Sequence, residues 1–592
     1  MLGADIFLPP ALAAPIGCDE RGASVIIGID LGTTNSAVAV WRDGRANLIP
    51  NSLGHVLTPS VVSLDDKGEV LVGLAARERL ATHPDRTAAA FKRLMGARRE
   101  LRLGDRDFLP EELSALVLSA LKRDAESLLG EPVGEAVITV PAYFNDKQRK
   151  ATRRAGELAG LKVERLLNEP TAAALAHGLH NLADETRFLV FDLGGGTFDV
   201  SILEIFEGII EVRATTGDNR LGGEDFNAVI VDMARRRFAT DWGDQARDGG
   251  PLHARLSVAA EMTRRALTTQ PEGAAFSVVW RDQLFEMLIG SHAFEAEAAD
   301  LIARLKEPVL RALRDGRMIV EALKEVVLVG GATRMPLVRK AVTRMFGRFP
   351  AAGTNPDEAV VIGAAIQAGL KARDAALKEV VLTDVCPYSL GVDVGARLGG
   401  GAVRGGLFAP IIERNTVVPA SRVSTFATLT DLQAKVIFNI YQGEARLVAD
   451  NIHLGSVEVP VPRAPAGEIT VDCRFSYDIN GLLEVDVYVP ETGERGELVI
   501  VNDDDLSTAE LAERRAALAA LKYHPRDADA NRAALARAAR CFENSLGERR
   551  EYVANLATRF EAALERQEPR EIDEQRESLS HALDDLEGEL WL

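Results

Sequence analysis

The chain has 592 residues, more than one hydrophobic core usually supports, so we expect two or three domains. Its 69 basic and 88 acidic residues give a formal net charge of -19, which repels nucleic-acid phosphates and anionic membranes and argues against both as primary partners. Hydrophobic residues make up 47% of the chain, which predicts large buried cores and excludes wholesale disorder.

The cysteines predict a reducing environment. They form neither a CxxC pair nor a cluster with metal-ligand spacing, and nothing in their positions indicates a disulfide framework. The four residues are Cys18, Cys386, Cys473 and Cys541. A cytoplasmic location fits this pattern best.

The first 24 residues are predicted to be an unstructured extension. Residues 11–14 end an apolar stretch that faintly resembles a secretory signal, but Asp5 and two adjacent prolines interrupt it and no basic segment precedes it. A start codon placed too far upstream is the other favoured interpretation. No apolar run in the chain approaches the length of a membrane-spanning helix.

Residues 25–376 show the alternation of an α/β domain, in which short β-branched runs alternate with longer amphipathic segments. The segment at 25–34 is echoed by the segment at 188–197, and each is followed by another strand-like run. The echo predicts two related lobes.

Each echoed segment places an aspartate, Asp30 or Asp192, at the end of a buried strand and directly before a glycine turn. Glycines let backbone N–H groups approach phosphate oxygens, threonine hydroxyls add donors, and an aspartate can hold hydrated Mg²⁺ through water. One such turn is more often only a strand end, but two copies with matching flanks favour a phosphate site. The chain lacks a GxxxxGK[ST] sequence, so the site is not a Walker-type loop.

A β-rich region begins near Cys386, where strand-like segments alternate with turn signals. Apolar residues at 469–477 and at 483–489 recur at every second position around Asn480-Gly481, which predicts a hairpin with a primed turn. From Leu506 the chain is rich in Ala, Leu, Glu and Arg, and Ser507 and Glu510 form a capping box. Helix-breaking residues then divide this region into about four helices.

Five short motifs resemble signatures of the heat-shock protein 70, or DnaK-type, chaperone family. They are GIDLGTTNS at 28–36, VPAYFND at 140–146, NEPTAAA at 168–174, FDLGGGTFDV at 191–200 and VLVGGATRMP at 327–336. Their order and spacing also match, and the resemblance extends from residue 25 to about residue 501. It implies an actin-like fold that binds ATP or ADP with Mg²⁺, and it allows K⁺ as a further ion.

The resemblance implies roles for the residues around the phosphates. Asp30 and Asp192 would orient hydrated Mg²⁺ and the attacking water, Lys92 would lie near the γ-phosphate, and Glu169 and Asp199 would assist at the water and at the outer shell of the metal. The phosphates would be held by the two glycine turns, namely by Gly32, Thr33, Thr34, Asn35, Gly194, Gly195, Gly196 and Thr197.

The resemblance also implies a set of residues for the adenosine. They are Gly222, Gly223, Glu261, Arg264, Arg265, Thr268, Gly330, Gly331, Arg334 and Asp357. Arg264 stands where the family usually has lysine. A guanidinium can still donate to ribose hydroxyls, but its planar fork differs from an ammonium, so we expect a different nucleotide affinity.

The second half of the chain distinguishes a chaperone from other enzymes with an actin-like fold. Residues 377–385 resemble the family's apolar interdomain linker, a strand that can add to a sheet edge in one state and be released in another. Residues 386–505 resemble its peptide-binding β-sandwich, and residues 506–592 its short α-helical lid. Residues that would line the peptide groove are Val392, Phe426, Leu429, Val436 and Phe438. Leu429 and Phe438 are larger than usual, which predicts a narrower or shallower pocket.

The resemblance further implies partners and a relay. Unfolded or client polypeptides would bind the sandwich, and a J-domain cochaperone would bind at Arg165, Asn168, Thr171 and Asp384, while Pro141 and Arg149 would pass the nucleotide state to the linker. A nucleotide-exchange factor is an optional partner. The short outer subdomains, the brief tail and the sequence around Cys386 resemble the specialised bacterial HscC branch, and Thr383 in place of a leucine predicts weaker coupling.

The predicted function is therefore that of an ATP-dependent chaperone whose ATP hydrolysis drives binding and release of extended apolar peptides. One alternative is a nucleotide-binding holdase or regulatory protein without productive turnover. The other is a small-molecule kinase of the actin-like superfamily, against which the β-rich second region argues.

Overall fold

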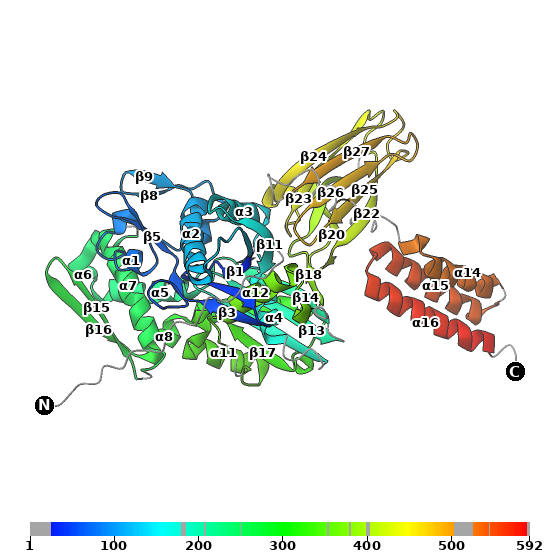
Figure 1. The fold of residues 1–592 in the computed structure, drawn as a ribbon. Helices are drawn as coiled ribbons and strands as arrows, with labels where there is room; N and C mark the ends of the chain where they lie inside the picture. Colours follow the sequence, from blue (N-terminus) through cyan, green and yellow to red (C-terminus); the bar gives the residue numbers. More distant parts are fainter. Residues whose placement is uncertain are drawn as a thin grey trace.

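The computed structural model describes residues 25–178, 185–206, 209–248, 250–270, 272–351, 355–377, 381–397, 403–501, 515, 525–543 and 545–588. In Figure 1 the chain forms an α/β body, a β-sandwich and a group of C-terminal helices. The predicted extension at 1–24 and the capping box at 507–510 lie outside the described residues.

The first lobe is built on a mixed sheet with the order β11-β10-β1-β2-β3. β1 runs parallel to β10 and antiparallel to β2, so that the strand that ends at Asp30 lies at the centre. The strands are β1 (Ile26–Asp30), β2 (Asn35–Arg42), β3 (Arg45–Ile49), β10 (Glu135–Val140) and β11 (Lys162–Asn168), with β4 (Thr58–Pro59) paired to β2.

The second lobe repeats this arrangement, as the sequence echo predicted. In its sheet, β12 runs antiparallel to β13 and parallel to β17, just as β1 does with β2 and β10. Asp192 therefore holds the same place in this lobe as Asp30 in the first. The strands are β12 (Thr186–Leu193), β13 (Phe198–Phe206), β14 (Ile209–Asp218) and β17 (Glu325–Val329).

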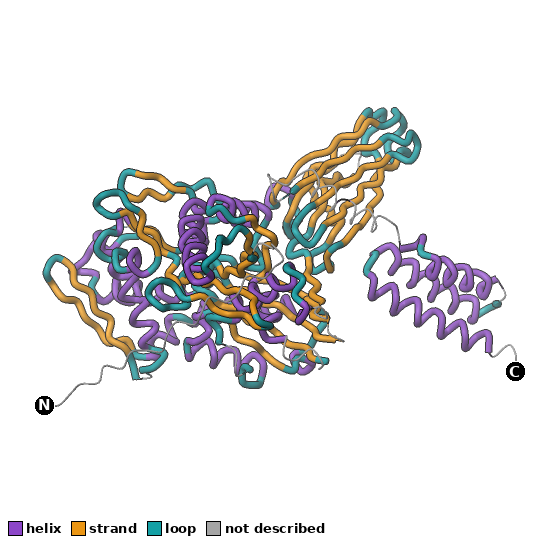
Figure 2. The backbone as a smooth tube through the Cα atoms, viewed as in Figure 1, coloured by secondary structure: helices purple, strands orange, loops and turns teal. Residues whose placement is uncertain are grey.

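Two central helices pack closely between the lobes. A Cβ built on Gly363 of α12 would lie 1.8 Å from the backbone oxygen of Ala172 in α4, so only glycine allows the two helices to come this close. Figure 2 shows how helices surround the strands of both lobes. The longer helices of this body are α2 (Pro110–Leu129), α3 (Asp146–Leu158), α4 (Glu169–Gly178), α5 (Gly223–Arg237), α7 (Pro251–Ala266), α10 (Lys306–Asp315), α11 (Pro336–Phe346) and α12 (Ala359–Lys371).

Smaller elements complete the two lobes. The short helices are α1 (Leu74–Arg77), α6 (Ala239–Trp242), α8 (Ser291–Glu297) and α9 (Ala299–Arg304), and the 3₁₀ turns include η2 (Phe91–Leu94), η5 (Gly331–Arg334) and η6 (Ala375–Leu377). The small sheets contain β5 (Val61–Leu64), β6 (Val70–Val72), β7 (Thr87–Ala89), β8 (Leu101–Leu103), β9 (Arg106–Phe108), β15 (Ala274–Trp280) and β16 (Gln283–Ile289).

Residues 381–385 of the predicted linker form a strand that extends the second lobe's sheet beyond β14. β18 (Val381–Val385) runs parallel to β14, with Val381 opposite Ile209 and Thr383 opposite Glu211. On its other side, β18 pairs antiparallel with the short strand β21 (Val417–Val418). The sheet of the second lobe thus continues through β18 to β21 at the start of the sandwich.

The sandwich contains two four-stranded sheets with the orders β20-β19-β23-β24 and β22-β25-β26-β27. Their inner faces share one core, in which Val392, Ile440, Phe475 and Val485 are each fully buried. The strands are β19 (Leu390–Arg397), β20 (Val403–Ile412), β22 (Ala420–Ala427), β23 (Lys435–Gln442), β24 (Ile452–Pro460), β25 (Thr470–Tyr477), β26 (Leu483–Tyr488) and β27 (Arg495–Ile500).

The predicted hairpin at Asn480-Gly481 is present, but the prediction of a primed turn was wrong. A primed two-residue turn requires a positive φ at its first central residue, and type I′ requires one at both, but of these two residues only the second, Gly481, has a positive φ, at 86°. The Gly481 N–H bonds to the Asp478 carbonyl, and the Asp478 N–H bonds to the Leu482 carbonyl, so the loop has three residues. The Asp478 carboxylate also accepts from the N–H groups of Asn480 and Leu482, which stabilises the longer loop.

The C-terminal helices form their own small core around Val553, Phe560 and Leu583. They are α14 (Asp529–Glu543), α15 (Glu548–Arg566) and α16 (Pro569–Gly588), and the helix expected before them falls on residues of which only Arg515 is described. The corner between α15 and α16 contacts the edge strand β22, where the Gln567 side-chain amide donates to the Val423 carbonyl at 3.0 Å. At the same corner Arg570 pairs with Glu211 of β14.

Candidate functional site

A cavity of about 510 Å³ lies between the two lobes and brings the predicted residues together. Its lining includes both echoed turns, the Lys92 region and the turn after β17, which are far apart in the sequence. Predicted residues that line it are Asp30, Gly32, Thr33, Thr34, Asn35, Lys92, Glu169, Asp192, Gly194, Gly195, Thr197, Gly223, Arg264, Arg265, Thr268, Gly330, Gly331, Arg334 and Asp357.

Four predicted residues lie just behind this lining. Gly196 and Gly222 support the second glycine turn, since a Cβ on Gly222 would lie 2.5 Å from the backbone nitrogen of Gly196. Asp199 is buried behind the carboxylates, and Glu261 pairs with Arg265 at 2.5 Å. These four residues shape the cavity or support its charged groups.

The two glycine turns face each other across the cavity. A Cβ on Gly195 would lie 2.0 Å from the Thr34 hydroxyl oxygen of the opposite turn. Gly330 has a φ of +82°, and a Cβ there would lie 2.3 Å from the Leu193 carbonyl. Glycine is thus required where the second turn approaches Thr34 of the first lobe and where the end of β17 approaches the end of β12, and without side chains the backbone N–H groups there stay accessible to an anionic ligand.

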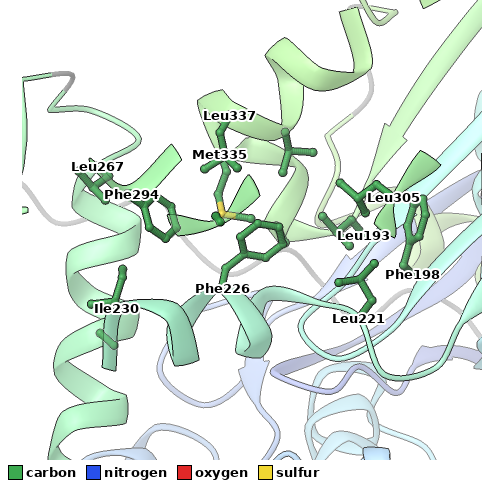
Figure 3. Close-up of a cluster of buried hydrophobic side chains, with 14 of the residues drawn as sticks. Leu193, Phe198, Leu221, Phe226, Ile230, Leu267, Phe294, Leu305, Met335 and Leu337 are labelled. Carbon is green, nitrogen blue, oxygen red and sulfur yellow. The ribbon is translucent and has the colours of Figure 1, made fainter. Parts of the chain in front are cut away.

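A hydrophobic core fixes the second turn from behind. Leu193 and Phe198, which flank that turn, join Leu221, Phe226 and Met335 in one buried cluster (Figure 3). Leu193 and Phe198 also pair with each other at the end of the β12–β13 hairpin. By fixing Leu193 and Phe198, the core also fixes the backbone of their neighbours Asp192 and Asp199 in the β12–β13 hairpin.

Buried carboxylates gather at the centre of the cavity. Burial and the neighbouring Glu169 carboxylate raise the pKa of Asp30 to about 7 and that of Asp199 to about 8, and they also raise the pKa of Asp192 well above its usual range. Hydrogen bonds from the Thr139 hydroxyl to Asp30 and from the Tyr143 N–H to Asp199 oppose the shifts. Such a group of acids favours a bound cation.

Lys92 supplies positive charge beside these acids. Its ammonium nitrogen lies 2.6 Å from the Glu169 carboxylate oxygen, and both side chains are buried. Lys92 lies in η2, which follows Ala90 in a left-handed conformation, whereas Glu169 begins α4 directly after β11. A buried ammonium at this position can offset the negative charge of a phosphate.

The residues fit Mg²⁺. Within the described part of the chain, the Asp192 Oδ2 atom is buried and has no hydrogen-bond partner. A carboxylate oxygen without a hydrogen-bond partner suits a hard cation that is held directly or through water. Mg²⁺ is such a cation, because it prefers oxygen ligands and keeps several of its waters. Asp30 and Asp192 are the residues that would hold it.

The opposite end of the cavity can hold a nucleoside. The Arg334 guanidinium donates to the Asp357 carboxylate at 2.9 and 2.7 Å, which holds its plane across the cavity mouth. The Arg264 Nε atom donates to the Asn227 side chain at 2.7 Å and is therefore partly committed to protein contacts. Planar guanidinium groups can stack on a base.

Several functional residues were not predicted from the sequence. Arg93 bridges the lobes by donating to both carboxylate oxygens of Asp225, at 3.2 and 3.1 Å, and the tandem Lys92-Arg93 was the only available signal. Six further lining residues were also missed, although two of them, Ala332 and Met335, lie within the motif at 327–336. The unpredicted lining residues are Leu57, Thr269, Ala332, Met335, Pro356 and Val360.

Comparisons with known proteins agree with this geometry. The family model described as Hsp70 protein matches residues 26–102 and 97–591. This chain belongs to the Hsp70 family. Chaperone protein DnaK of Thermotoga petrophila and that of Thermotoga maritima are each 42% identical to it over 496 residues, which is 82% of this chain and 82% of the relative. Chaperone protein DnaK of Thermosipho africanus is 43% identical over 491 residues, 81% of each chain.

As an Hsp70 protein, the chain is an ATP-dependent molecular chaperone, and it is an ATPase. The family places a two-lobed ATPase domain before a substrate-binding domain, and the two lobes and the β-sandwich are these parts. In the part of the chain that the structure describes, no helix has the length and apolar character needed to cross a membrane.

In this Hsp70 protein the predicted linker contacts the end of β11, beside the Lys92–Glu169 ion pair. Asn168, which directly precedes Glu169, donates to both carboxylate oxygens of Asp384 in β18. Arg149 donates to the Asn168 side chain at 2.6 Å and to the carbonyls of Ala142 and Phe144. The predicted relay residue Arg149 therefore contacts the turn that begins at Pro141 as well as the residue that binds the linker.

Of the residues expected to bind a J-domain cochaperone, Asp384 lies in the linker strand β18 and Asn168 contacts it. The Arg165 guanidinium donates to the Gln367 side chain at 2.8 Å. Burial raises the pKa of Asp384, and the positive charge of Arg165 opposes that rise. All four side chains, those of Arg165, Asn168, Thr171 and Asp384, are buried in this arrangement. Asn168 is accordingly placed to hold Asp384 of the linker strand.

The sandwich also contacts the ATPase domain directly. Arg414 pairs with Asp315 of α10 through two hydrogen bonds of 2.8 and 3.0 Å. The Gln442 side chain accepts from the Asp146 N–H at 2.9 Å. These contacts join the base of the sandwich to both lobes while β18 is bound.

The five predicted groove residues divide into two groups. Val392 and Phe438 are buried in the sandwich core, whereas Phe426, Leu429 and Val436 are partly exposed. The rings of Phe426 and Phe438 lie 5.4 Å apart between their centroids. The partly exposed three are the residues of this set that solvent can reach in the described arrangement.

Proposed function

We propose that this Hsp70 chaperone couples nucleotide state to peptide binding through the linker strand β18. The observation that carries the proposal is the adjacency of Asn168 and Glu169. Glu169 lies in the cavity and pairs with Lys92, while its neighbour binds Asp384 of the linker. If the start of α4 moves during hydrolysis, Asn168, which directly precedes Glu169, would transmit that movement to the linker.

The chemistry assigned to the cavity is hydrolysis of ATP. Lys92 and the backbone of the two glycine turns offset phosphate charge, and Asp30 and Glu169 orient the attacking water and accept hydrogen bonds from it. Mg²⁺ bound at Asp30 and Asp192 would neutralise charge that develops on the phosphates, and K⁺ is a further ion for the same acidic site. Asp199 lies behind Asp192 and supports the outer shell of the metal.

The ligand of the sandwich is proposed to be an extended apolar segment of an unfolded or client polypeptide. Such a segment binds by backbone hydrogen bonds and by pockets for alternate side chains. Val392, Phe426, Leu429, Val436 and Phe438 would form the pocket, and the large Leu429 and Phe438 side chains would make it narrow or shallow. The buried position of Phe438 supports a shallow pocket in this arrangement.

The docked linker corresponds to the ATP-bound state of the proposed cycle. ATP binding would close the lobes and keep β18 on β14, and hydrolysis would release the strand, because an edge strand can exchange sheet pairing for solvent. The C-terminal helices would act as the lid, and their contacts with β22 and Glu211 tie them to the same arrangement. The domain limits proposed are residues 25–376, 377–385, 386–505 and 506–592.

A J-domain cochaperone is the proposed partner of the linker region. Because Arg165, Asn168, Thr171 and Asp384 are buried while β18 is docked, we propose that the cochaperone changes the position of β18, the strand that carries Asp384. A nucleotide-exchange factor is proposed as an optional partner, and the HscC branch as the nearest specialised type. Cys386 and Cys473, which are buried and form no disulfide, support a cytoplasmic setting.

Release of a fluorescent apolar peptide from the full chain, with and without ATP, tests this function. Faster release with ATP is the expected result, and Asp384→Asn, which weakens the linker contact, should reduce the acceleration. Peptide binding that ignores ATP would favour a holdase. If no peptide binds and a sugar or acid is phosphorylated instead, the small-molecule kinase alternative would replace the proposal.

A further inference from the structure

Asp199 is held in place by a backbone group of the neighbouring loop. Its carboxylate Oδ1 atom accepts a hydrogen bond from the Tyr143 N–H at 3.1 Å. The surroundings leave little room, since a Cβ on Gly217 would lie 2.7 Å from the same oxygen and 3.2 Å from the Tyr143 Cβ. Tyr143 belongs to a tight turn in which the Phe144 N–H bonds to the Pro141 carbonyl. The position of Asp199 thus depends on the conformation of this turn.

Tyr388, which follows the linker strand by three residues, holds the same turn from the other side. Its hydroxyl donates to the Tyr143 carbonyl at 2.8 Å, and the two rings lie 4.4 Å apart with an interplanar angle of 36°. The Asn219 side chain donates to the same carbonyl at 2.6 Å. Tyr388, which follows the linker strand, therefore holds both the ring and the carbonyl of Tyr143. Asn219 of the ATPase domain holds the same carbonyl.

We propose that Tyr388 is a positioning residue for the ATPase site, which acts by fixing Tyr143 so that the Tyr143 N–H orients the Asp199 carboxylate. The inference rests on the proposed role of Asp199 in the outer shell of Mg²⁺. Because the carbonyl, ring and N–H belong to one residue in a tight turn, restraining the first two restricts the third. Tyr388 contacts this turn directly, whereas the contact of Asn168 with Asp384 reaches the turn only through Arg149.

The size of the effect follows from the distance between Tyr388 and the metal site. Partners of outer-shell groups typically change metal affinity or activity about 10–100-fold when they are removed. Tyr388 acts one contact further out and shares the Tyr143 carbonyl with Asn219, so Tyr388→Phe should have a smaller effect, about threefold. Removal of both donors should reduce the Mg²⁺-dependent gain in affinity by more than the product of the two single reductions, since each donor can partly replace the other.

The test measures the affinity of the full chain for a fluorescent ADP analogue with and without Mg²⁺. Tyr388→Phe should reduce the Mg²⁺-dependent gain in affinity about threefold and leave the metal-free affinity unchanged. Asn219→Ala together with Tyr388→Phe should reduce it further. Tyr488→Phe, which removes a partly exposed hydroxyl from β26, is the matched control and should change neither value.

Two outcomes would overturn the inference. One is an unchanged Mg²⁺-dependent gain in both Tyr388→Phe and the double variant. The other is an equal loss of affinity with and without Mg²⁺, which would indicate a general structural role for the hydroxyl. A wild-type chain that shows no Mg²⁺-dependent gain at all would instead contradict the proposed function of the cavity, and the two failures are therefore distinguishable.

Discussion

The side-chain amide nitrogen of Asn168 lies 3.1 and 3.0 Å from the two carboxylate oxygens of Asp384. Asn168 ends β11 in the ATPase domain, whereas Asp384 lies in the linker strand. Because both side chains are buried, this contact is an energetically significant link between the nucleotide cavity and the linker.

Asn168→Ala should weaken docking of the linker strand. It leaves the Asp384 carboxylate buried with fewer donors, and hydrogen bonds to charged groups contribute about 1.5–3 kcal/mol each. We expect faster hydrogen exchange in residues 381–385 of the ATP-bound protein, with little change in ATP affinity. Asn47→Ala, on the outer strand β3, is the matched control, and identical exchange in the two variants would contradict this assignment.

Arg149→Ala should leave ATP binding intact and weaken the stimulation of ATP hydrolysis by peptide. Arg149 holds the Ala142 and Phe144 carbonyls together with Asn168, so its loss separates the turn at Pro141 from the linker contact. Steady-state hydrolysis with and without an apolar peptide measures the effect. Undiminished stimulation would remove Arg149 from the relay.

Binding of Mg²⁺ and ADP near pH 7 should release protons. The pKa of Asp30 is raised to about 7 and that of Asp199 to about 8, chiefly by burial and then by Glu169, and a cation favours their ionised forms. The heat of binding, measured in buffers of different ionisation enthalpy, counts the protons. A heat that does not depend on the buffer would show that these groups are already ionised.

The same shifts predict how stability depends on pH. In the metal-free protein the folded state binds more protons than the unfolded chain between the ordinary aspartate pKa of 3.8 and the raised values. The free energy of unfolding should therefore fall as pH rises through this window to about 8, and saturating Mg²⁺ with ADP should reduce that slope.

Leu429→Ala should change the size preference of the peptide groove. Leu429 is partly exposed near the start of the loop between β22 and β23, so removal of its side chain opens space rather than a buried cavity. A bulky peptide centred on leucine should bind more tightly to the variant, as fluorescence anisotropy would show. Equal affinity before and after the substitution would argue against a narrow pocket.

Gly363→Ala should destabilise the ATPase domain strongly. The new Cβ would lie 1.8 Å from the Ala172 carbonyl oxygen, and a backbone clash between α12 and α4 is relieved only by moving the helices. We expect a loss of about 3 kcal/mol, the upper end for overpacking, visible as a lower midpoint of thermal unfolding. Gly405→Ala, which has open space and no positive φ, should unfold like the wild type.

Much of the nucleotide site could be predicted because its residues occur in short motifs. Asp30 and Asp192 were evident from the repeated pattern of a strand followed by glycines, and the structure confirms that the two lobes repeat each other. The assignment of Lys92 and Arg264 required the family resemblance, since neither residue is distinctive in its local sequence.

Contacts between distant segments could not be predicted. The pairs Arg93 with Asp225 and Tyr388 with Tyr143 depend on how the lobes and the sandwich meet, and no local pattern encodes that arrangement. The turn type at Asn480-Gly481 was wrong for a related reason. The preceding Asp478 accepts two backbone N–H groups and thereby favours a longer loop than the dipeptide alone would suggest.

The parallel register of β18 on β14 has a consequence for how this protein can change during evolution. Successive residues of a strand point to opposite faces, so Asp384 meets Asn168 only when the number of residues before it has the correct parity. Point substitutions in the linker alter the strength of docking, but insertion or deletion of a single residue would turn Asp384 away altogether. Linker length is therefore under a stricter constraint than linker composition, and natural variation there should proceed by exchange of side chains.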